Sequence, residues 1–304
     1  MQTAMTRPRP DFIGIGLQKA GTRWLYNQLQ EHPDFWMPPI KELHFFDRAF
    51  PHSSMVAKIR KDAKKARGMV NNAGTIVKST RAAKISSWSQ ESKRFGRLLQ
   101  SLTISREPDF AVYSSLFSFA GQKITGDITP AYSELEPSVV NAIAAHLPDV
   151  KIILMLRDPI SRLWSNLNDA VGNGRLAVTV VSELAELKQT LRSGFAGSLL
   201  YPSEIHRRWA EHIPAHRFRW FFLDDVIADP QATRAAILRY LGGNPDESSG
   251  ALALSHNSKD GRPRAKLEGD LLKCLIAEFE AELRACAEIF GGAALGWLQK
   301  YGLK

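Results

Sequence analysis

A short apolar segment that runs into a glycine-punctuated loop constrains this chain more than any other feature. Residues 13–24 read Ile-Gly-Ile-Gly-Leu-Gln-Lys-Ala-Gly-Thr-Arg-Trp, which predicts a strand over 11–15 and a helix over 22–31. Such a turn forms an anion site, because backbone N–H groups and the positive end of the helix dipole both face it. Lys19 and Arg23 add positive charge. The expected ligand is a phosphate or a related anion; the alternative is a turn that binds nothing.

The loop departs from the pattern of nucleoside triphosphatases, which is Gly, four residues, Gly, Lys, then Ser or Thr. Gly16 and Gly21 keep the glycine spacing, but Thr22 stands in the place of the lysine. Arg23 replaces the hydroxyl that binds Mg²⁺, and the lysine lies inside the loop as Lys19. Because those enzymes need both missing groups, the loop favours a phosphate-containing ligand that requires no metal.

Charge and cysteine content narrow the class of protein. A net charge of +9 predicts attraction to anions, without choosing among nucleotides, acidic glycans, nucleic acid and membrane surfaces. The two cysteines, Cys274 and Cys286, form no motif typical of zinc sites, and we expect buried, reduced thiols of a reducing compartment. There is no apolar targeting segment near Met1 and no apolar run of membrane-spanning length. We therefore expect a cytoplasmic protein.

Strand-like and helix-like segments alternate along the rest of the chain. Further strands are predicted at 123–126, 150–156 and 218–223. Further helices are predicted at 137–146, 160–168, 182–193, 201–212, 230–241 with Asp229 as its cap, and 267–290. This alternation predicts an α/β fold, a single P-loop-like domain whose central parallel sheet is flanked by helices. We assign residues 1–10 to a flexible leader and 11–304 to the domain.

The region from about residue 48 to 118 carries the weakest pattern. We expect it to be helical and variable, and to contribute to an acceptor pocket together with residues 171–200. Lys58–Arg67 holds six basic residues in ten. Such a run is either a solvated helix surface or a contact for an anionic acceptor or a membrane surface.

Four segments are expected to meet at the carboxyl edge of the sheet, where open α/β folds bind ligands. They are 16–23, 41–47, 127–132 and 157–165. Together they resemble the sulfotransferases that use 3′-phosphoadenosine-5′-phosphosulfate (PAPS), in particular the heparan-type and bacterial carbohydrate branch. The resemblance extends over residues 12–301.

The resemblance implies that the first loop holds the 5′-phosphosulfate of the donor. The residues that it assigns to this task are Lys19, Ala20, Gly21, Thr22, Arg23 and Trp24. Lys19 matches the lysine that contacts the bridging oxygen and the sulfuryl group. Since sulfuryl transfer builds negative charge on the leaving phosphate oxygen, a lysine aimed at that oxygen is worth most in the transition state.

Two further segments match parts of the family that hold the 3′-phosphate and close over the donor. Arg157 ends a predicted strand, and Ser165 follows eight residues later on a helix. Arginine suits a phosphate because it offers several donors in a planar fork. The alternatives are a salt bridge from Arg157 to Asp158, and an ordinary surface serine. In the late loop the resemblance points to Lys259, Gly261 and Arg262, which otherwise form a basic surface loop.

Residues 41–46, Lys-Glu-Leu-His-Phe-Phe, resemble the family's Lys-Glu-x-x-Phe-Phe segment, whose glutamate takes the acceptor proton. A carboxylate within reach of a hydroxyl can deprotonate it in the transition state. We therefore assign Glu42 as the base. His44 is the rival base, or a structural histidine. Phe45 and Phe46 are interpreted as core residues rather than a substrate platform.

The resemblance implies a sulfotransferase that moves a sulfuryl group from PAPS to an acceptor hydroxyl and releases adenosine 3′,5′-bisphosphate (PAP), without a metal. The acceptor is a carbohydrate, a glycolipid or a small metabolite, with contact to a membrane surface if it is a glycolipid; no nucleic-acid partner is expected. Ile128 replaces a lysine of the family's Glu-Lys-Thr/Ser-Pro-x-Tyr segment, which weakens the case for a highly sulfated glycan. The alternatives are a P-loop-like nucleotide kinase and a non-enzymatic basic protein that binds anions or nucleic acid. The oligomeric state stays open.

Overall fold

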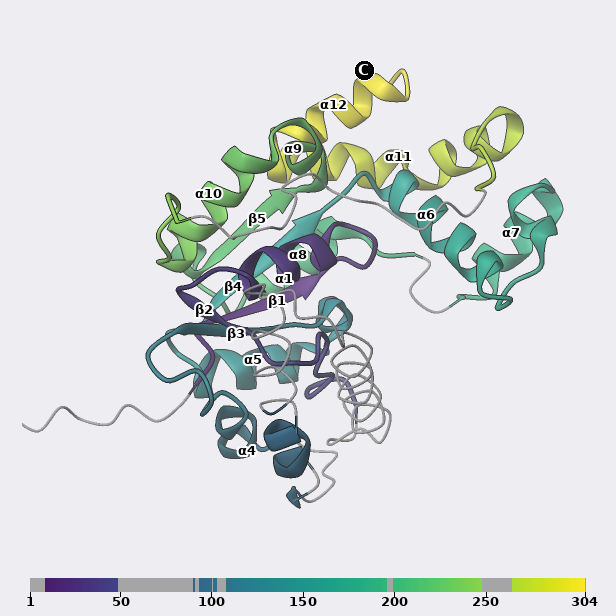
Figure 1. Ribbon diagram of the computed structural model, residues 1–304. Helices are drawn as coiled ribbons and strands as arrows, with labels where there is room; N and C mark the ends of the chain where they lie inside the picture. The colour runs from purple at the N-terminus through teal and green to yellow at the C-terminus, as the bar shows by residue number, and fades with distance from the viewer. Residues whose placement is uncertain are drawn as a thin grey trace, which may run out of the picture.

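The computed structural model describes residues 9–48, 90, 93–99, 101–102, 108–195, 199–247 and 264–303. Within them a parallel five-stranded sheet, with strand order β2-β3-β1-β4-β5, is flanked by helices (Figure 1). The strands are β1 (Phe12–Gly16), β2 (Phe35–Trp36), β3 (Ile124–Ile128), β4 (Lys151–Leu156) and β5 (Phe218–Phe222). The predicted α/β class with a central parallel sheet is confirmed.

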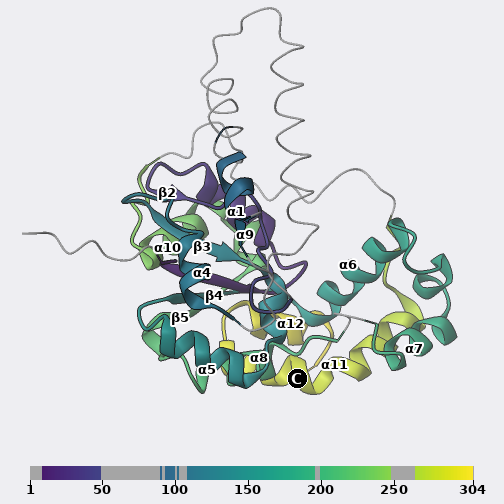
Figure 2. The same ribbon diagram turned by 90° about the horizontal axis from the view of Figure 1, so that it is seen from below.

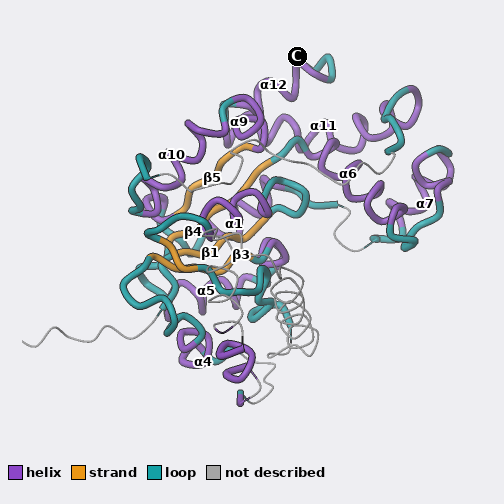
Figure 3. The backbone as a smooth tube through the Cα atoms, viewed as in Figure 1, coloured by secondary structure: helices purple, strands orange, loops and turns teal. Residues whose placement is uncertain are grey.

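Helices cover both faces of this sheet (Figure 3). Figure 2 shows α1, α9 and α10 on one side and α5 and α8 on the other. The α-helices are α1 (Thr22–Gln30), α4 (Phe110–Ser115), α5 (Pro137–His146), α6 (Pro159–Gly172), α7 (Leu184–Arg192), α8 (Pro202–Ala210), α9 (Leu223–Ala228), α10 (Pro230–Leu241), α11 (Gly269–Phe290) and α12 (Ala293–Lys300). The 3₁₀ turns are η1 (Pro130–Glu134), η2 (Val178–Val181) and η3 (Ala215–Arg217).

The sheet's interior explains the apolar runs of the sequence. All five residues of β1 are buried, as are the last five of β4, because helices pack on both faces of a parallel sheet. Gly126 allows β1 and β3 to approach each other. A Cβ atom there would lie 2.5 Å from the carbonyl oxygen of Phe12, a distance that a side chain cannot accept.

Most predicted elements are observed within two residues of their predicted bounds, and the helix at 137–146 has the same bounds. Strand β3 is a correction: it continues to Ile128, so Asp127 and Ile128 lie in the sheet and not in the following loop. The reason is the pairing with β1, where Ile13 opposes Asp127 and Gly14 opposes Ile128. Helix α6 runs four residues beyond its predicted end at 168, to Gly172.

Both cysteines lie on α11 and are free thiols, but only Cys286 is buried, so the expectation of two buried thiols was wrong for Cys274. Of the helices that the structure describes, none combines the length and apolarity needed to span a bilayer. Lys58–Arg67 and the late-loop residues Lys259, Gly261 and Arg262 lie outside the described residues.

Candidate active site

The four predicted segments meet at the carboxyl edge of the sheet. The loop after β1 is tied to β4 by Leu17 N, which donates to Met155 O at 2.8 Å. The guanidinium of Arg157, which follows β4, donates to the carbonyl oxygen of Lys19 at 2.9 Å. The segment after β3 joins β1 through Thr129 N, which donates to a β1 carbonyl oxygen at 2.9 Å. The fourth segment, residues 41–47, packs against the end of β3, where Leu43 N lies 3.5 Å from Asp127 Oδ1.

The loop after β1 requires its two glycines. Gly16 and Gly21 have φ values of 145° and 92°, which favour glycine. Their missing Cβ atoms would also lie 3.2 Å from the carbonyl oxygen of Pro130 and 3.0 Å from a methyl group of Leu223. Within the described chain, α1 starts without a capping side chain and without an acidic residue in its first turn. Its first N–H groups therefore suit an anionic ligand.

The side chains of this loop differ in exposure. Ala20 and Trp24 are buried in the core, so only their backbone can serve a ligand. Thr22 is buried at the start of α1, whereas Arg23 is exposed. Lys19 Nζ lies 2.8 Å from a carboxylate oxygen of Asp169 on α6. The predicted catalytic lysine therefore forms an ion pair with Asp169 of α6.

Of the predicted 3′-phosphate residues, Arg157 lies just before α6 and Ser165 lies on it. Burial lowers the pKa of Arg157, and so does the nearby charge of Arg264. Ser165 is 7% exposed. The alternative partner of Arg157, Asp158, accepts hydrogen bonds from Lys300 Nζ at 2.7 Å and from the Tyr301 hydroxyl. The guanidinium itself binds the backbone of the first loop, so the two predicted donor-binding segments are in direct contact.

Residues 41–47 concentrate charge around Glu42. Lys41 Nζ contacts one carboxylate oxygen of Glu42, and His44 Nε2 lies 3.8 Å from the other. The second ring nitrogen of His44 lies 2.8 Å from Asp47 Oδ2. Phe45 and Phe46 are 4% and 7% exposed and belong to the hydrophobic core, which confirms their interpretation as core residues.

These contacts fix the charge states of the segment. Burial of Glu42 opposes its ionisation, but the nearby His44 and the hydrogen bond and charge of Lys41 outweigh burial and lower its pKa to about 2. Burial likewise opposes the imidazolium of His44, yet its hydrogen bond with Asp47 and the nearby carboxylate of Glu42 raise its pKa to about 9. At neutral pH the segment therefore presents a carboxylate beside a protonated histidine.

Three residues of the described chain other than glycine adopt positive φ: Lys19 at 65°, Glu42 at 70° and His44 at 53°. A left-handed conformation costs a residue with a side chain about 1–3 kcal/mol, and such residues cluster at functional sites. These are the three residues that the sequence predicts to be catalytic. The backbone strain is an observation independent of the motifs that singled them out.

A comparison with models of known protein families identifies the family of this chain. A family model described as the sulfotransferase family matches residues 10–247. The chain belongs to the sulfotransferase family. The predicted family is thereby confirmed.

Solved structures show the same fold. A sulfotransferase from Alicyclobacillus acidocaldarius is 20% identical, with a TM-score of 0.58, and the match covers 95% of this chain and 98% of that one. A sulfotransferase from Mycobacterium avium is 15% identical, with a TM-score of 0.51 and coverage of 98% and 78%. No curated protein sequence matched the chain.

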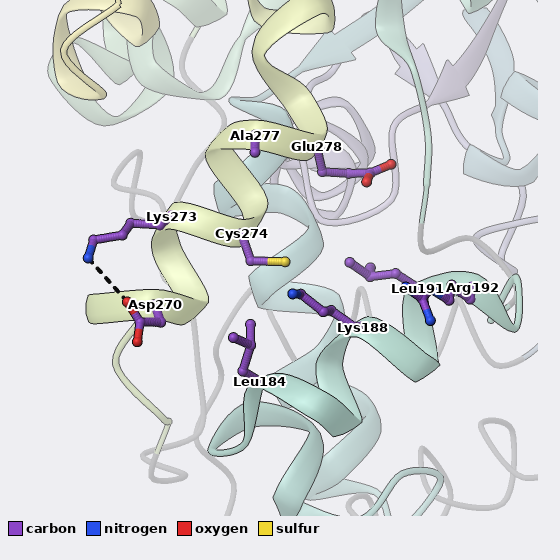
Figure 4. A pocket seen from close by; sticks show the side chains of 9 residues that line it. All are labelled: Leu184, Lys188, Leu191, Arg192, Asp270, Lys273, Cys274, Ala277 and Glu278. Atoms are coloured by element: carbon purple, nitrogen blue, oxygen red, sulfur yellow. Dashed lines mark hydrogen bonds and ion pairs between the residues drawn. The ribbon is translucent and has the colours of Figure 1, made fainter.

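The sulfotransferase also contains a cavity of about 550 Å³ between α7 and α11 (Figure 4). It combines basic, acidic and apolar side chains with a half-buried thiol: Leu184, Lys188, Leu191, Arg192, Asp270, Lys273, Cys274, Ala277 and Glu278. Of the predicted donor and base residues that the structure describes, none lines it. Across the part of the chain that the structure describes, no group of three or more His, Cys, Asp or Glu side chains is arranged to hold a metal.

The structure adds three residues that the sequence analysis missed. Asp47 follows His44 by three positions within residues 41–47, which we call the base segment after the predicted role of Glu42, and this spacing could have indicated its contact with His44. Asp169 is paired with Lys19 across 150 residues of sequence, and no local pattern connects the two. Arg264 lies beside Arg157, as its influence on that pKa indicates, and its position two residues after Arg262 in one basic run was the available signal.

Contacts of the next residue place Arg264 near α6. Ala265 accepts a hydrogen bond from Trp164 Nε1 at 2.8 Å and donates one to Asn168 Oδ1 at 2.8 Å. Ala265 therefore lies against α6, the helix that carries Ser165.

Proposed function

We propose that this sulfotransferase transfers the sulfuryl group of PAPS to an acceptor hydroxyl, with Glu42 as the base and Lys19 at the leaving group. The observation that carries the proposal is the pairing of two features at one sheet edge. An uncapped helix N-terminus lies beside two cations, Lys19 and Arg157, and an ionised carboxylate lies on the neighbouring segment. Phosphate recognition and hydroxyl activation need these two features respectively.

The donor's two phosphate groups have different expected partners. The N–H groups at the start of α1, with Thr22 and Arg23, suit the 5′-phosphate. Arg157 and Ser165 suit the 3′-phosphate, and Arg264 can add a second guanidinium. Burial and the charge of Arg264 both disfavour the guanidinium of Arg157, and Asp158 and Asp224 offset them only in part, so a bound anion would stabilise the guanidinium further, which supports this assignment.

The chemistry requires one proton transfer and one exchange of bonds at sulfur. The acceptor oxygen forms a bond to sulfur while the bond from sulfur to the phosphate oxygen breaks, and the acceptor proton passes to a carboxylate oxygen of Glu42. Because the pKa of Glu42 is about 2, the carboxylate takes the proton only as the hydroxyl becomes acidic in the transition state. His44 is already protonated at neutral pH, which favours Glu42 as the base.

Lys19 has to exchange partners for this reaction. Its ammonium group lies 2.8 Å from a carboxylate oxygen of Asp169 in the structure. The negative charge of the phosphosulfate competes with that carboxylate, and the charge that develops on the leaving oxygen strengthens the new contact in the transition state.

The acceptor belongs to the wider class of hydroxyl compounds, that is, a carbohydrate, a glycolipid or a small metabolite. Ile128 is buried in β3 at 1% exposure, so this position offers no cation to an acceptor sulfate. This favours an acceptor with few sulfate groups.

Ligand-dependent thermal stability tests the donor assignment. A ligand that binds only the folded state at 100 times its Kd stabilises the protein by about 2.7 kcal/mol. We expect PAP to raise the Tm, and ATP with Mg²⁺ or an oligonucleotide to leave it unchanged. Stabilisation by ATP with Mg²⁺ alone would favour a kinase, and stabilisation by the oligonucleotide alone a nucleic-acid-binding protein. Labelled PAPS offered to fractionated metabolites, with detection of added sulfate by mass, then identifies the acceptor.

A further inference from the structure

Three consecutive backbone N–H groups of the base segment face one buried cluster at the end of β3. The N–H of Phe45 donates to the Tyr132 hydroxyl at 2.8 Å. The N–H of Leu43 lies 3.5 Å from Asp127 Oδ1, and that of His44 lies 3.5 Å from Thr129 Oγ1. The segment is therefore held by side chains that come more than eighty residues later in the sequence.

Asp127 lies at the centre of this cluster. The Tyr132 hydroxyl donates to Asp127 Oδ2 at 2.7 Å, and Thr129 Oγ1 donates to Oδ1 at 2.8 Å. The Tyr113 hydroxyl of α4 lies 3.4 Å from Oδ2. All four side chains are at most 1% exposed. A buried carboxylate is tolerated only when hydrogen bonds satisfy its oxygens, and here two hydroxyls from η1 and the strand end do so.

The carboxylate sets the direction of these hydroxyl groups. A hydroxyl has one donor and two acceptor lone pairs. Because the hydroxyls of Tyr132 and Thr129 donate their protons to Asp127, their lone pairs are available to accept hydrogen bonds from the backbone N–H groups of the base segment. A neutral side chain at 127 would not impose this direction on both hydroxyls at once.

The same arrangement accounts for the unusual backbone of the segment. One way in which successive N–H groups point to one side is an alternation with left-handed conformations, as in the backbone nests that bind anions. Glu42 and His44 adopt positive φ, and they flank Leu43. The contacts with the Asp127 cluster offset the cost of those two conformations.

We propose that Asp127 is a positioning residue: through Tyr132 and Thr129 it holds residues 42–45 in the backbone conformation that presents Glu42 and His44 to the acceptor. The effect on catalysis rests on the proposed function, in which Glu42 is the base. The effect on the backbone does not depend on it.

Hydrogen exchange tests the backbone part. Asp127→Asn keeps the size of the side chain, and Tyr132→Phe removes only the hydroxyl. Each should raise the amide exchange rate of residues 43–45 by about tenfold, the effect of losing one typical hydrogen bond. The matched control is Tyr240→Phe, which removes a hydroxyl that donates to Ile152 O at 3.2 Å elsewhere in the fold. Exchange in this segment that equals the parent's in both variants would overturn the proposal.

Steady-state kinetics test the catalytic part. Asp127→Asn and Tyr132→Phe should lower kcat by about 10- to 100-fold, the effect of a small misplacement of a catalytic group, while the Kd for PAP stays within twofold of the parent. A merely structural role would weaken donor binding and kcat together, and that result would overturn the proposal. If Asp127→Asn does not fold, Tyr132→Phe and Thr129→Val decide the question.

The outcomes also separate this proposal from the proposed function. Faster exchange at residues 43–45 together with full turnover in Glu42→Gln would refute the base assignment and leave the anchoring by Asp127 standing. Loss of turnover in Glu42→Gln, with parental exchange and kcat in Asp127→Asn and Tyr132→Phe, would refute the anchoring and leave the base in place.

Discussion

The donor loop and the base segment place their key residues in the same kind of backbone conformation by different means. The loop after β1 contains Gly16 and Gly21 and is tied to the neighbouring strand by a backbone bond from Leu17 to Met155. Residues 41–47 contain no glycine and are held by buried side chains 84 to 87 positions away. One segment is shaped by its own sequence, and the other by a distant cluster that it packs against.

The two segments also differ in how their charges are neutralised. Lys19 pairs with Asp169 on another element, α6, and in the proposed function it exchanges that carboxylate for the phosphosulfate. Glu42 lies beside Lys41 and His44 of its own segment, so its charge is balanced within that segment. The donor side is therefore expected to respond to ligands, and the base side to pH and to changes in its anchoring.

Removal of the base charge is expected to have the largest effect. Glu42→Gln should lower kcat by about 10²–10⁴-fold, the contribution of a general base, because the amide cannot accept the hydroxyl proton. The Kd for PAP should stay at the parent value, since the residue lies outside the donor segments. Isothermal titration and initial rates measure the two quantities.

A matched control for this variant is Glu280→Gln, which also removes a glutamate from an ion pair, with Arg284 at 2.8 Å. It should keep the parent rate. A Glu42→Gln enzyme with full turnover, alongside an inactive His44→Ala enzyme, would transfer the base role to the histidine.

The leaving-group lysine should come second. Lys19→Ala is expected to lower kcat by about 10²–10³-fold, as does the removal of one stabiliser of a developing oxyanion. Single-turnover rates at saturating donor isolate this step. Lys273→Ala provides the control, because it removes a lysine that pairs with Asp270 at 3.1 Å on the surface of α11. Equal rates for Lys19→Ala and the parent would place the stabilising charge elsewhere.

Loss of the guanidinium after β4 should affect binding more than rate. Arg157→Ala is expected to raise the Kd for PAP by about 10- to 100-fold, since charge-assisted hydrogen bonds to a phosphate contribute about 1.5–3 kcal/mol. The effect should shrink for adenosine 5′-monophosphate, which lacks the 3′-phosphate. The exposed Arg284→Ala serves as the control, and an equal loss for both nucleotides would exclude a specific 3′-phosphate contact.

The contrast between the two segments also explains what the sequence could predict. The strand, loop and helix around Lys19 were predicted because a local pattern of glycines and apolar residues determines them. The parallel sheet followed from alternating strands and helices. In the same way, the capping aspartate of α10 was found at its predicted position, where Asp229 accepts from Ala232 N at 2.9 Å.

What the sequence could not reveal depends on contacts between distant positions. The end of β3 was misplaced because Asp127 and Ile128 were interpreted as loop residues, and only their pairing with β1 and their burial show that they belong to the sheet. The Lys19 to Asp169 pair and the anchoring of residues 42–45 likewise join segments without a shared pattern. The identity of the base segment was predicted from its resemblance, but its conformation was not.

The smallest expected effect is the response of the base segment to alkaline pH. Because the hydrogen bond with Asp47 and the nearby carboxylate of Glu42 outweigh burial and raise the pKa of His44 from 6.5 to about 9, the folded state binds this proton more tightly than the unfolded state does. The resulting stabilisation is complete below about pH 6.5 and is lost as the pH rises through about 9.

The urea midpoint of the parent should therefore fall over this interval relative to that of His44→Gln. The comparison removes the titration of lysines and tyrosines, which both proteins share. The exposed His216→Gln should follow the parent. Parallel curves for the parent and His44→Gln would show that the histidine is not held as an imidazolium, and Lys41 would then be the cationic partner of Glu42 within the segment.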